Sequence, residues 1–296
     1  MHMNSPIDDV AFLARSKNRI AILGLLTDEQ PHSRDELMDA SDVSRPTLAR
    51  ILDDLESRTW IKQRGQTCRI TSLGIWVHEE FTELLGTMET AQKLRDVIEW
   101  LPTDTLAFDL NCLTDSTITL PSRSDPLAPM NRASTLGRTA DKSRLVTHAF
   151  PAPCLNAHWQ AVTTGKGRFH AVITPRVIET MTEPAHESQF VDILASERAE
   201  VFVYEDNIPR VVGINDSVVY FGIDDQKGAP LALIETDDET VLTWAEETFE
   251  TYRRNAAPLT PDEFSRRQET ARDSERIGGS LEAPSIPSDS PARRHQ

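Results

Sequence analysis

The residues of this 296-residue chain best suited to chemistry lie at the start of one predicted helix, residues 44–57. They are Ser44, Arg45, Thr47 and Arg50. An arginine can grip a guanine edge with two hydrogen bonds or bind a phosphate, and hydroxyls at a helix start can hold a phosphate beside the free backbone N–H groups. The alternative is a solvated helix face, in which the arginines pair with Asp53 or Asp54 and the hydroxyls only cap the helix. We expect DNA contact at these four residues, ending near Arg50 because the two aspartates repel phosphate.

The elements that position these side chains follow from the apolar spacing. Four residues recur at helical intervals, so that one side of the helix packs inward and the basic side faces water. They are Leu48, Ile51, Leu52 and Leu55. Upstream, Ser33 and Glu36 have the spacing of a capping box, which predicts a second, shorter helix before a turn at residues 41–43. Two helices joined by so short a turn are typical of a helix-turn-helix, whose second helix enters the major groove of double-stranded DNA.

A strand pair is predicted directly after the second helix. Residues 60–62 alternate like a strand, residues 64–66 turn, and residues 67–70 return. The basic side chains of this hairpin are Lys62, Arg64 and Arg69. They are candidates for contacts to the DNA backbone or minor groove, with simple solvent exposure as the alternative. Together with an earlier helix over residues 10–27, the hairpin completes a winged helix-turn-helix.

The net charge of −16 opposes binding to DNA, because phosphate contacts require basic residues. Residues 1–71, however, hold ten Lys and Arg against eleven Asp and Glu, so nearly all of the excess acidity lies in the remainder of the chain. Only six of the 31 basic residues are lysine, which, with the many carboxylates, favours a protein of a high-salt, halophilic cytoplasm over an ordinary acidic protein. In high salt, phosphate contacts weaken, so such a protein depends more on base contacts and shape.

Composition also limits the other classes of function. No run approaches eighteen apolar residues and the first residues contain no apolar signal region, so we expect a soluble, cytoplasmic protein with no membrane association. The three cysteines are scattered and odd in number, which excludes a disulfide framework and a paired metal-knuckle spacing. We expect no cofactor and no bound metal.

After the hairpin, a long helix is predicted to run from Thr71 toward Leu101, where Pro102 stops it. Its apolar residues recur at spacings of three and four, as in a coiled-coil seam between two chains or a face packed on a second domain. They are Val77, Phe81, Leu84, Met88, Ala91, Leu94, Ile98 and Leu101. We favour the first interpretation, which makes the protein a homodimer.

The rest of the chain mixes strand and helix patterns, with strands expected at 106–110 and 117–120 and a last helix at 239–255. The fold class is therefore α+β, in which a winged helix-turn-helix and a connector helix precede a mixed α/β domain. The tail is rich in polar residues and is expected to be disordered. The expected segments are 1–71, the DNA-binding domain; 72–102, the connector; 103–256, the effector domain; and 257–296, the tail.

Three stretches of the chain carry a family resemblance: Ser44-Arg45-Pro46-Thr47, Leu101-Pro102, and the run from Leu233 to Ala245. They resemble the corresponding stretches of haloarchaeal regulators of the methanogenesis-regulator (FilR) type. The resemblance covers about residues 8–256. It implies a winged helix related to the ArsR and TrmB groups and a phospholipase-D-like middle domain that senses a signal. It supplies neither the effector nor the operator.

Phospholipase-D-like domains include phosphodiesterases, which need His-x-Lys with the histidine as nucleophile. Here Val172 follows His170 at the lysine position and Phe150 follows His148, so we expect no catalytic residue and no enzyme activity. His148, His158 and His170 remain weak candidates for effector binding. Cys154 and His158 lie four residues apart on a predicted helix, which leaves a metal-responsive or redox-responsive regulator as an alternative.

The sequence therefore predicts a transcription regulator that binds double-stranded DNA and an unknown small-molecule or protein effector. A second alternative keeps the winged helix as a protein–protein adaptor that does not read DNA. The overall acidity favours the adaptor, whereas the basic helix and hairpin oppose it.

Overall fold

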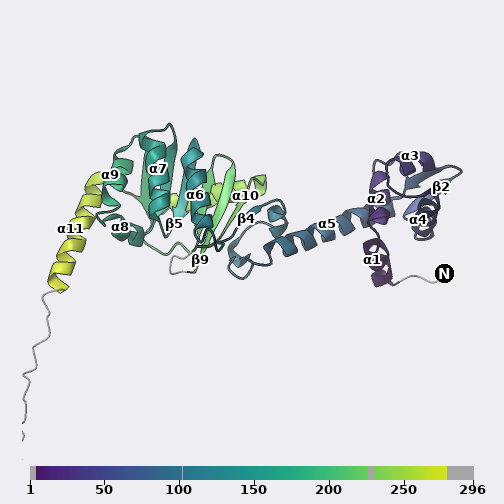
Figure 1. The fold of residues 1–296 in the computed structure, drawn as a ribbon, viewed down its shortest axis with the longest axis horizontal. Coiled ribbons are helices and arrows are strands. Elements are labelled where there is room, and N and C mark those ends of the chain that lie inside the picture. The colour runs from purple at the N-terminus through teal and green to yellow at the C-terminus, as the bar shows by residue number, and fades with distance from the viewer. Residues whose placement is uncertain (1–4, 102, 226–229, 279–296) are drawn as a thin grey trace, which may run out of the picture. The chain divides into compact units, whose positions relative to one another are not determined.

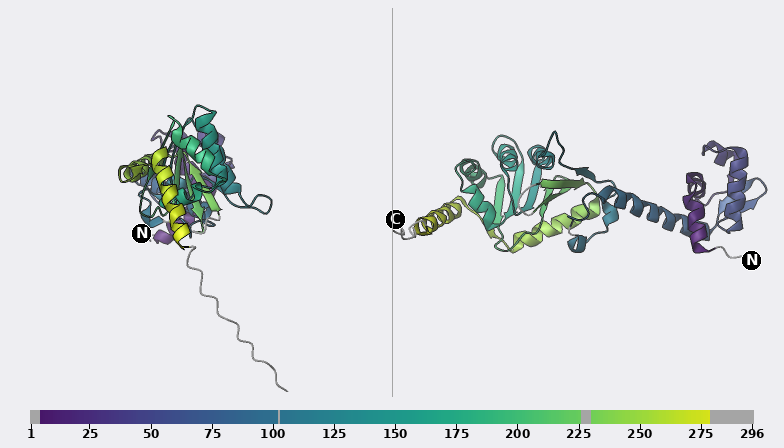
Figure 2. Two further views of the ribbon diagram at one scale, coloured as in Figure 1. Left: turned by 90° about the vertical axis from the view of Figure 1, so that its left-hand side faces the viewer. Right: turned by 60° about the horizontal axis from the view of Figure 1, so that its bottom comes forward.

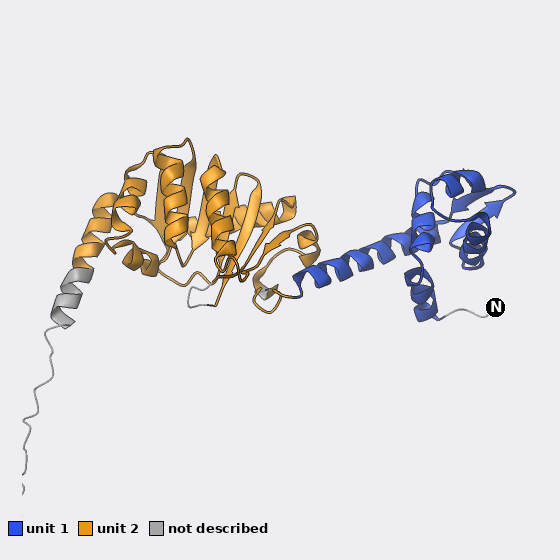
Figure 3. Ribbon diagram, viewed as in Figure 1, with its two compact units in different colours: residues 1–95 blue, residues 96–296 orange. Residues whose placement is uncertain are grey.

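The computed structural model describes residues 5–101, 103–225 and 230–278. The chain divides into two compact units, residues 1–95 and 96–296 (Figure 3). Pro102, expected to end the connector, and residues 279–296 of the expected tail lie outside the described residues. Helices followed by a sheet-rich region confirm the α+β class.

The described residues of unit 1 form five helices and a three-stranded antiparallel sheet in the order β1-β3-β2 (Figure 1). Its elements are α1 (Pro6–Ala14), α2 (Lys17–Leu25), β1 (His32–Ser33), α3 (Arg34–Asp39), α4 (Arg45–Ser57), β2 (Ile61–Arg64), β3 (Thr67–Ile70) and α5 (Ser72–Leu94). The single helix expected over residues 10–27 is wrong, because the chain is extended at Ser16, which begins α2 as its N-cap residue. Serine is favoured at such a position.

The core of unit 1 gathers apolar residues from its helices and from the β2–β3 hairpin, and the four predicted inward residues of α4 are all buried in it. The predicted capping box of α3 is also present. Ser33 N–H donates to the Glu36 carboxylate at 2.7 Å, and Glu36 N–H donates to Ser33 Oγ at 3.2 Å. Thr71 likewise caps α5, since its Oγ1 accepts from Gly74 N–H at 3.0 Å.

The connector helix α5 ends at Leu94, seven residues before the expected end at Leu101, and the chain continues in turns. Of its predicted apolar stripe, Phe81 packs into the unit 1 core, whereas Leu84 and Met88 are exposed, at 39% and 53%. Among the described residues, no helix has the length and apolar character needed to cross a bilayer.

Unit 2 contains an eight-stranded sheet in the order β11-β7-β6-β5-β8-β9-β10-β4. The central strands β5, β6 and β7 are parallel, and the other neighbours pair antiparallel. The strands are β4 (Thr117–Thr119), β5 (Lys142–Thr147), β6 (Arg168–Ile173), β7 (Ala199–Val203), β8 (Val211–Asn215), β9 (Val218–Asp224), β10 (Pro230–Thr236) and β11 (Ala257–Pro258). Residues 169 and 171–173 of β6 are all buried apolar side chains, as expected for a parallel strand covered on both faces.

Helices cover both faces of this sheet. They are α6 (Ala128–Thr139), α7 (Ala152–Thr163), α8 (Pro175–Met181), α9 (Glu187–Ala195), α10 (Glu239–Arg254) and α11 (Pro261–Gly278). Figure 2 shows α10 on the face opposite α6, α7 and α9. The strand expected at residues 106–110 is absent; this segment is irregular and leads into a 3₁₀ helix at Leu110–Leu113.

The expectation of a disordered tail from residue 257 is wrong for the described residues. β11 pairs with β7, and α11 follows it. Leu259 and Phe264 are 5% and 1% exposed and belong to the core of unit 2, where the Phe264 ring meets Phe190 at 5.2 Å. Two buried apolar residues are enough to dock a segment whose remaining residues are mostly polar.

We therefore predict that Phe264→Ala lowers the free energy of unfolding by about 3–5 kcal/mol, the usual cost of truncating a buried phenylalanine. Chemical denaturation monitored by circular dichroism measures the loss. Ser265→Ala, at an exposed position of the same helix, serves as the control and is expected to change stability little. Equal stabilities of the two variants would contradict the docking of α11.

Candidate nucleic-acid interface and effector cavities

At the start of α4, Ser44 and Arg45 are exposed and Thr47 is partly buried, and Arg50 is exposed about one turn further on. Ser44 occupies the N-cap position, but its hydroxyl bonds to Thr47 Oγ1 at 2.9 Å and makes no bond to a backbone N–H. The predicted side-chain cap is therefore wrong. Pro46, in the first turn, has no N–H to leave unpaired. The positive end of α4 is thus free of a side-chain acceptor, as anion binding requires.

Arg45 pairs with Asp35 of α3 at 2.8 Å rather than with Asp53 or Asp54. Both side chains are 76% exposed, so the pair contributes at most about 1 kcal/mol and costs little to exchange for another anion. The ion pair thus joins the start of α4 to α3, and Arg45 remains able to bind another anion.

Arg50 lines a polar groove of about 540 Å³ between α1 and α4. Three further arginines line the same groove: Arg15, Arg19 and Arg58. Arg19 and Arg58 lie over the Phe12 ring at 4.0 and 3.8 Å, whereas Arg15 and Arg50 are exposed. The sequence analysis missed Arg15, because only the return of α1 against α4 brings it beside Arg50.

The acidic residues near the end of α4 are at least partly exposed, but they have partners within unit 1. Asp54 lies 4.0 Å from Arg19, and Asp53 accepts from the Gln63 side-chain amide at 3.2 Å. That amide also donates to Glu56 at 3.0 Å, while its oxygen accepts from Arg34 at 2.7 Å. Gln63 thus ties the hairpin to both α3 and α4, and it engages carboxylates that otherwise oppose DNA.

The β2–β3 hairpin carries the remaining predicted cations at exposed positions. Its turn contains Gly65 at φ +60°, a conformation that favours glycine. Arg69 approaches Glu29 at 4.0 Å, and both side chains are about 60% exposed. Within the described residues, Lys62 and Arg64 form no ion pair. Unit 1 therefore presents unpaired positive charge on α4 and on the hairpin that follows it.

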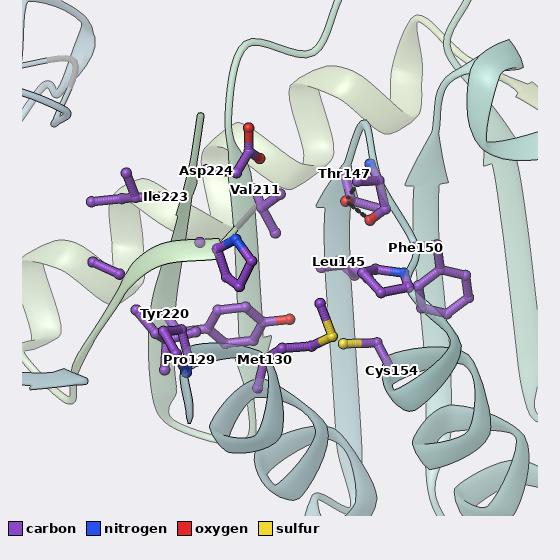
Figure 4. Close-up of a pocket in the computed structure, with 17 residues that line it drawn as sticks. Pro129, Met130, Leu145, Thr147, Phe150, Cys154, Val211, Tyr220, Ile223 and Asp224 are labelled. Carbon is purple, nitrogen blue, oxygen red and sulfur yellow. Dashed lines mark hydrogen bonds between the residues drawn. The ribbon is translucent and has the colours of Figure 1, made fainter. Parts of the chain in front are cut away.

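In unit 2, a cavity of about 90 Å³ lies between the sheet and helices α6 and α7 (Figure 4). Its walls are mainly apolar and include Met130, Phe150 and Cys154. Tyr220 of β9 forms one side and is 5% exposed. The ring lies across Gly213, its partner on β8, where an added Cβ would come within 2.0 Å of the tyrosine ring.

A larger cavity of about 790 Å³ lies in unit 2 where the carboxyl ends of β5 and β6 meet the start of β8. His148 follows β5 and its Nε2 lies 2.9 Å from the Asp224 carboxylate. Thr174 follows β6, and its buried hydroxyl has no hydrogen-bond partner among the residues that the structure describes. The crevice beyond the carboxyl ends of parallel strands is the usual ligand site of α/β sheets. The two cavities share the end of β9, residues 222–224.

The three predicted effector histidines do not meet in one site. His148 lines the larger cavity. His158 is 2% exposed and stacks on the Phe169 ring at 4.1 Å, and burial lowers its pKa to about 3. His170, half-buried on β6, has its pKa lowered mainly by burial, against the opposing effect of Glu200.

The proposed pairing of Cys154 with His158 has no support from the geometry. In the described part of the chain, no three His, Cys, Asp or Glu side chains form a group that could hold a metal ion. Burial also raises the pKa of the Cys154 thiol, which lies 3.5 Å from Ser134 Oγ. A raised pKa keeps the thiol protonated and unreactive.

Comparisons with known proteins identify both units. Residues 7–93 match the family described as HVO_A0261 N-terminal domain, and residues 126–255 match the family of the middle domain of methanogenesis regulatory protein FilR1. No sequence among curated proteins matches this chain.

Solved structures show more distant similarity. TrmBL2, an archaeal chromatin protein whose structure shows a mode of DNA binding, is 14% identical, with 86% of this chain and 100% of TrmBL2 covered at a TM-score of 0.40. NucT from Helicobacter pylori (12% identity, TM-score 0.39) and the phospholipase D family member Nuc from Salmonella typhimurium (14%, 0.40) each cover 49% of this chain and 99% of their own. These similarities are too distant to assign a function.

The two matched domains define a DNA-binding regulator of transcription. More particularly, the chain belongs to the haloarchaeal regulators of the FilR type.

The buried state of His158 predicts a specific pH dependence. Its folded pKa of about 3 lies below the ordinary value of 6.5, so the unfolded chain binds the proton more tightly. The stability that His158 contributes is therefore complete above pH 6.5 and is lost as the pH falls toward 3. Between pH 7.5 and 5 the loss is about 2 kcal/mol.

Chemical denaturation of the protein and of His158→Gln at both pH values measures this difference. We expect the variant to be less stable at pH 7.5 but to lose about 2 kcal/mol less on acidification, because glutamine does not titrate. The same pH dependence in both proteins would show that His158 is not buried in its neutral form.

Proposed function

We propose that the chain is a homodimeric regulator that inserts α4 into the DNA major groove and places the hairpin on the flanking backbone, as a winged helix-turn-helix. The observation that carries this proposal is the exposed cationic face of unit 1. It comprises Arg45 and Arg50 on α4 and Lys62, Arg64 and Arg69 on the hairpin. Ser44 and Thr47 bind a phosphate at the start of α4 in this proposal.

The groove between α1 and α4 extends this surface. Arg15 and Arg50 are exposed on its two sides, and the Phe12 ring holds the guanidinium groups of Arg19 and Arg58. A phosphate that approaches Arg50 thus meets the positive charge of Arg15, directly after α1, although Asp8 of α1 lines the same groove. The footprint therefore extends past Arg50 toward α1 rather than along α4 toward its acidic end.

We predict that Arg45→Ala with Arg50→Ala weakens operator binding by at least roughly thirtyfold, since each specific arginine contact is worth about 1–3 kcal/mol. The operator is first found by chromatin immunoprecipitation and sequencing of the tagged protein. Affinity is then measured by gel shift at fixed salt, with circular dichroism to check the fold.

The matched control is Arg123→Ala with Arg138→Ala, which removes two exposed cations from unit 2 and should retain operator binding. Unchanged binding by the α4 variant would reject the assignment of α4. If immunoprecipitation yields no sequence motif, the winged helix acts instead as a protein–protein adaptor.

The dimer contact is proposed on the connector helix. α5 exposes an unusual number of large apolar side chains: Leu73, Trp76, Leu84, Leu85 and Met88. A second copy of the same helix would cover this surface and bring two copies of α4 to the two halves of a palindromic operator.

We predict that Leu84→Glu converts the dimer to a monomer, because it places a charge in the apolar contact. Light scattering after size-exclusion chromatography measures the mass. Thr82→Glu adds the same charge on nearly the opposite side of α5 and should leave the dimer intact. A wild-type protein that is monomeric throughout the tested concentration range would reject the dimer.

The α/β domain is proposed to bind an effector that changes the relative placement of the two DNA-binding units through α5. An effector shifts DNA affinity only if it binds one arrangement more tightly than the other. The cavities of unit 2 supply places for such a molecule. The raised pKa of the Cys154 thiol argues against the redox alternative.

A further inference from the structure

The small cavity between the sheet and helices α6 and α7 combines apolar walls with one polar group that lacks a partner. Thr147 and Cys154 have partners of their own, since Thr147 Oγ1 accepts from Ala149 N–H at 3.0 Å and Cys154 contacts Ser134. The Tyr220 hydroxyl has no hydrogen bond to any described residue. Figure 4 shows it directed toward the sulfur atoms of Met130 and Cys154.

This hydroxyl is not sealed in the core: Tyr220 is 5% exposed, and its hydroxyl lies open to the cavity, where a bound molecule can reach it. Phenylalanine would fill the same space without leaving a polar atom unpaired. The chain nevertheless has tyrosine at this position and Gly213 opposite it, where any larger residue would collide with the ring. The position of the hydroxyl thus depends on Tyr220 of β9 and on Gly213 of the neighbouring strand β8.

The chemistry of the cavity restricts what can occupy it. Burial raises the pKa of Tyr220, so the hydroxyl stays protonated and is a neutral hydrogen-bond donor. The surrounding side chains of Met130, Ala133 and Leu145 offer no compensation for a charged group, and the carboxylate in the lining, Asp224, is already paired with His148. A volume of about 90 Å³ limits the buried part to the order of one six-membered ring, since an engineered apolar cavity of about 150 Å³ binds benzene.

We propose that this cavity binds a small uncharged molecule, such as a single aromatic ring, whose one carbonyl or hydroxyl oxygen accepts a hydrogen bond from Tyr220. That this molecule acts as the effector rests on the proposed regulatory function, whereas the binding of the molecule to the cavity does not. The cavity meets the larger polar one at residues 222–224, so a substituent on the ring would extend toward His148 and Asp224.

The experiment uses the full chain labelled with ¹³C at the methionine methyl groups, with phenol and toluene as probes and no DNA. Met130 lines the cavity and reports binding by its methyl resonance, while Met38 and Met88 of unit 1 serve as internal references. We expect saturable shifts at Met130 with both probes and tighter binding of phenol.

Tyr220→Phe removes only the hydroxyl and should weaken phenol binding about three- to tenfold, the loss expected for one hydrogen bond, without changing toluene binding. Tyr252→Phe, on α10 at the other face of the sheet, is the matched control and should behave as the wild type. Ala133→Leu fills the cavity and should abolish binding of both probes, with thermal unfolding as the check that the variant folds.

Several outcomes would overturn the proposal. They are no saturable shift at Met130, equal shifts of all methionines, and phenol binding that Tyr220→Phe leaves unchanged. Because DNA is absent, a failure here leaves the operator-binding proposal untouched. Conversely, loss of operator binding in the α4 variant has no bearing on the cavity.

Discussion

The burial of one face of α4 is the constraint on which the rest of unit 1 depends. Its leucine and isoleucine side chains fill the core between α2, α3 and the hairpin, so the rotation of the helix about its own axis is fixed. Arg45 and Arg50 face outward for this reason and not because of any contact of their own. Their ion pairs are weak or absent, which leaves the guanidinium groups free to exchange partners.

In unit 2, the position of the Tyr220 ring beside the small cavity depends on the absence of a side chain at one position of the neighbouring strand. Gly213 leaves a gap on β8, and the Tyr220 ring occupies it. The neighbouring sheet positions carry packed apolar residues, as does α7 above them. The Tyr220 hydroxyl therefore lies among apolar side chains, where the sequence pattern alone would predict only packed apolar residues.

Local patterns predicted much of this molecule. The capping box at Ser33, the buried face of α4 and the helix expected at 239–255 follow from spacing within a few residues of chain. Features that depend on distant segments escaped prediction. Arg15 joins Arg50 only through the packing of α1 and α4, and the docking of α11 depends on Phe264, one aromatic ring in a polar segment. The three histidines lie apart, with His148 directly after β5, His158 on α7 and His170 on β6.

The short strand β11 determines how the sheet of unit 2 terminates. Pro258 pairs with Phe202 at the border of β7, and Leu259 N–H then donates to Val201 at 2.8 Å before the chain turns into α11. Proline has no N–H with which to continue a ladder, so a foreign strand finds no regular template on this side. This edge of the sheet is thereby protected against the addition of strands from other molecules, the step by which fibrils grow. The protection comes from β11, which belongs to a segment with the polar composition of a disordered tail.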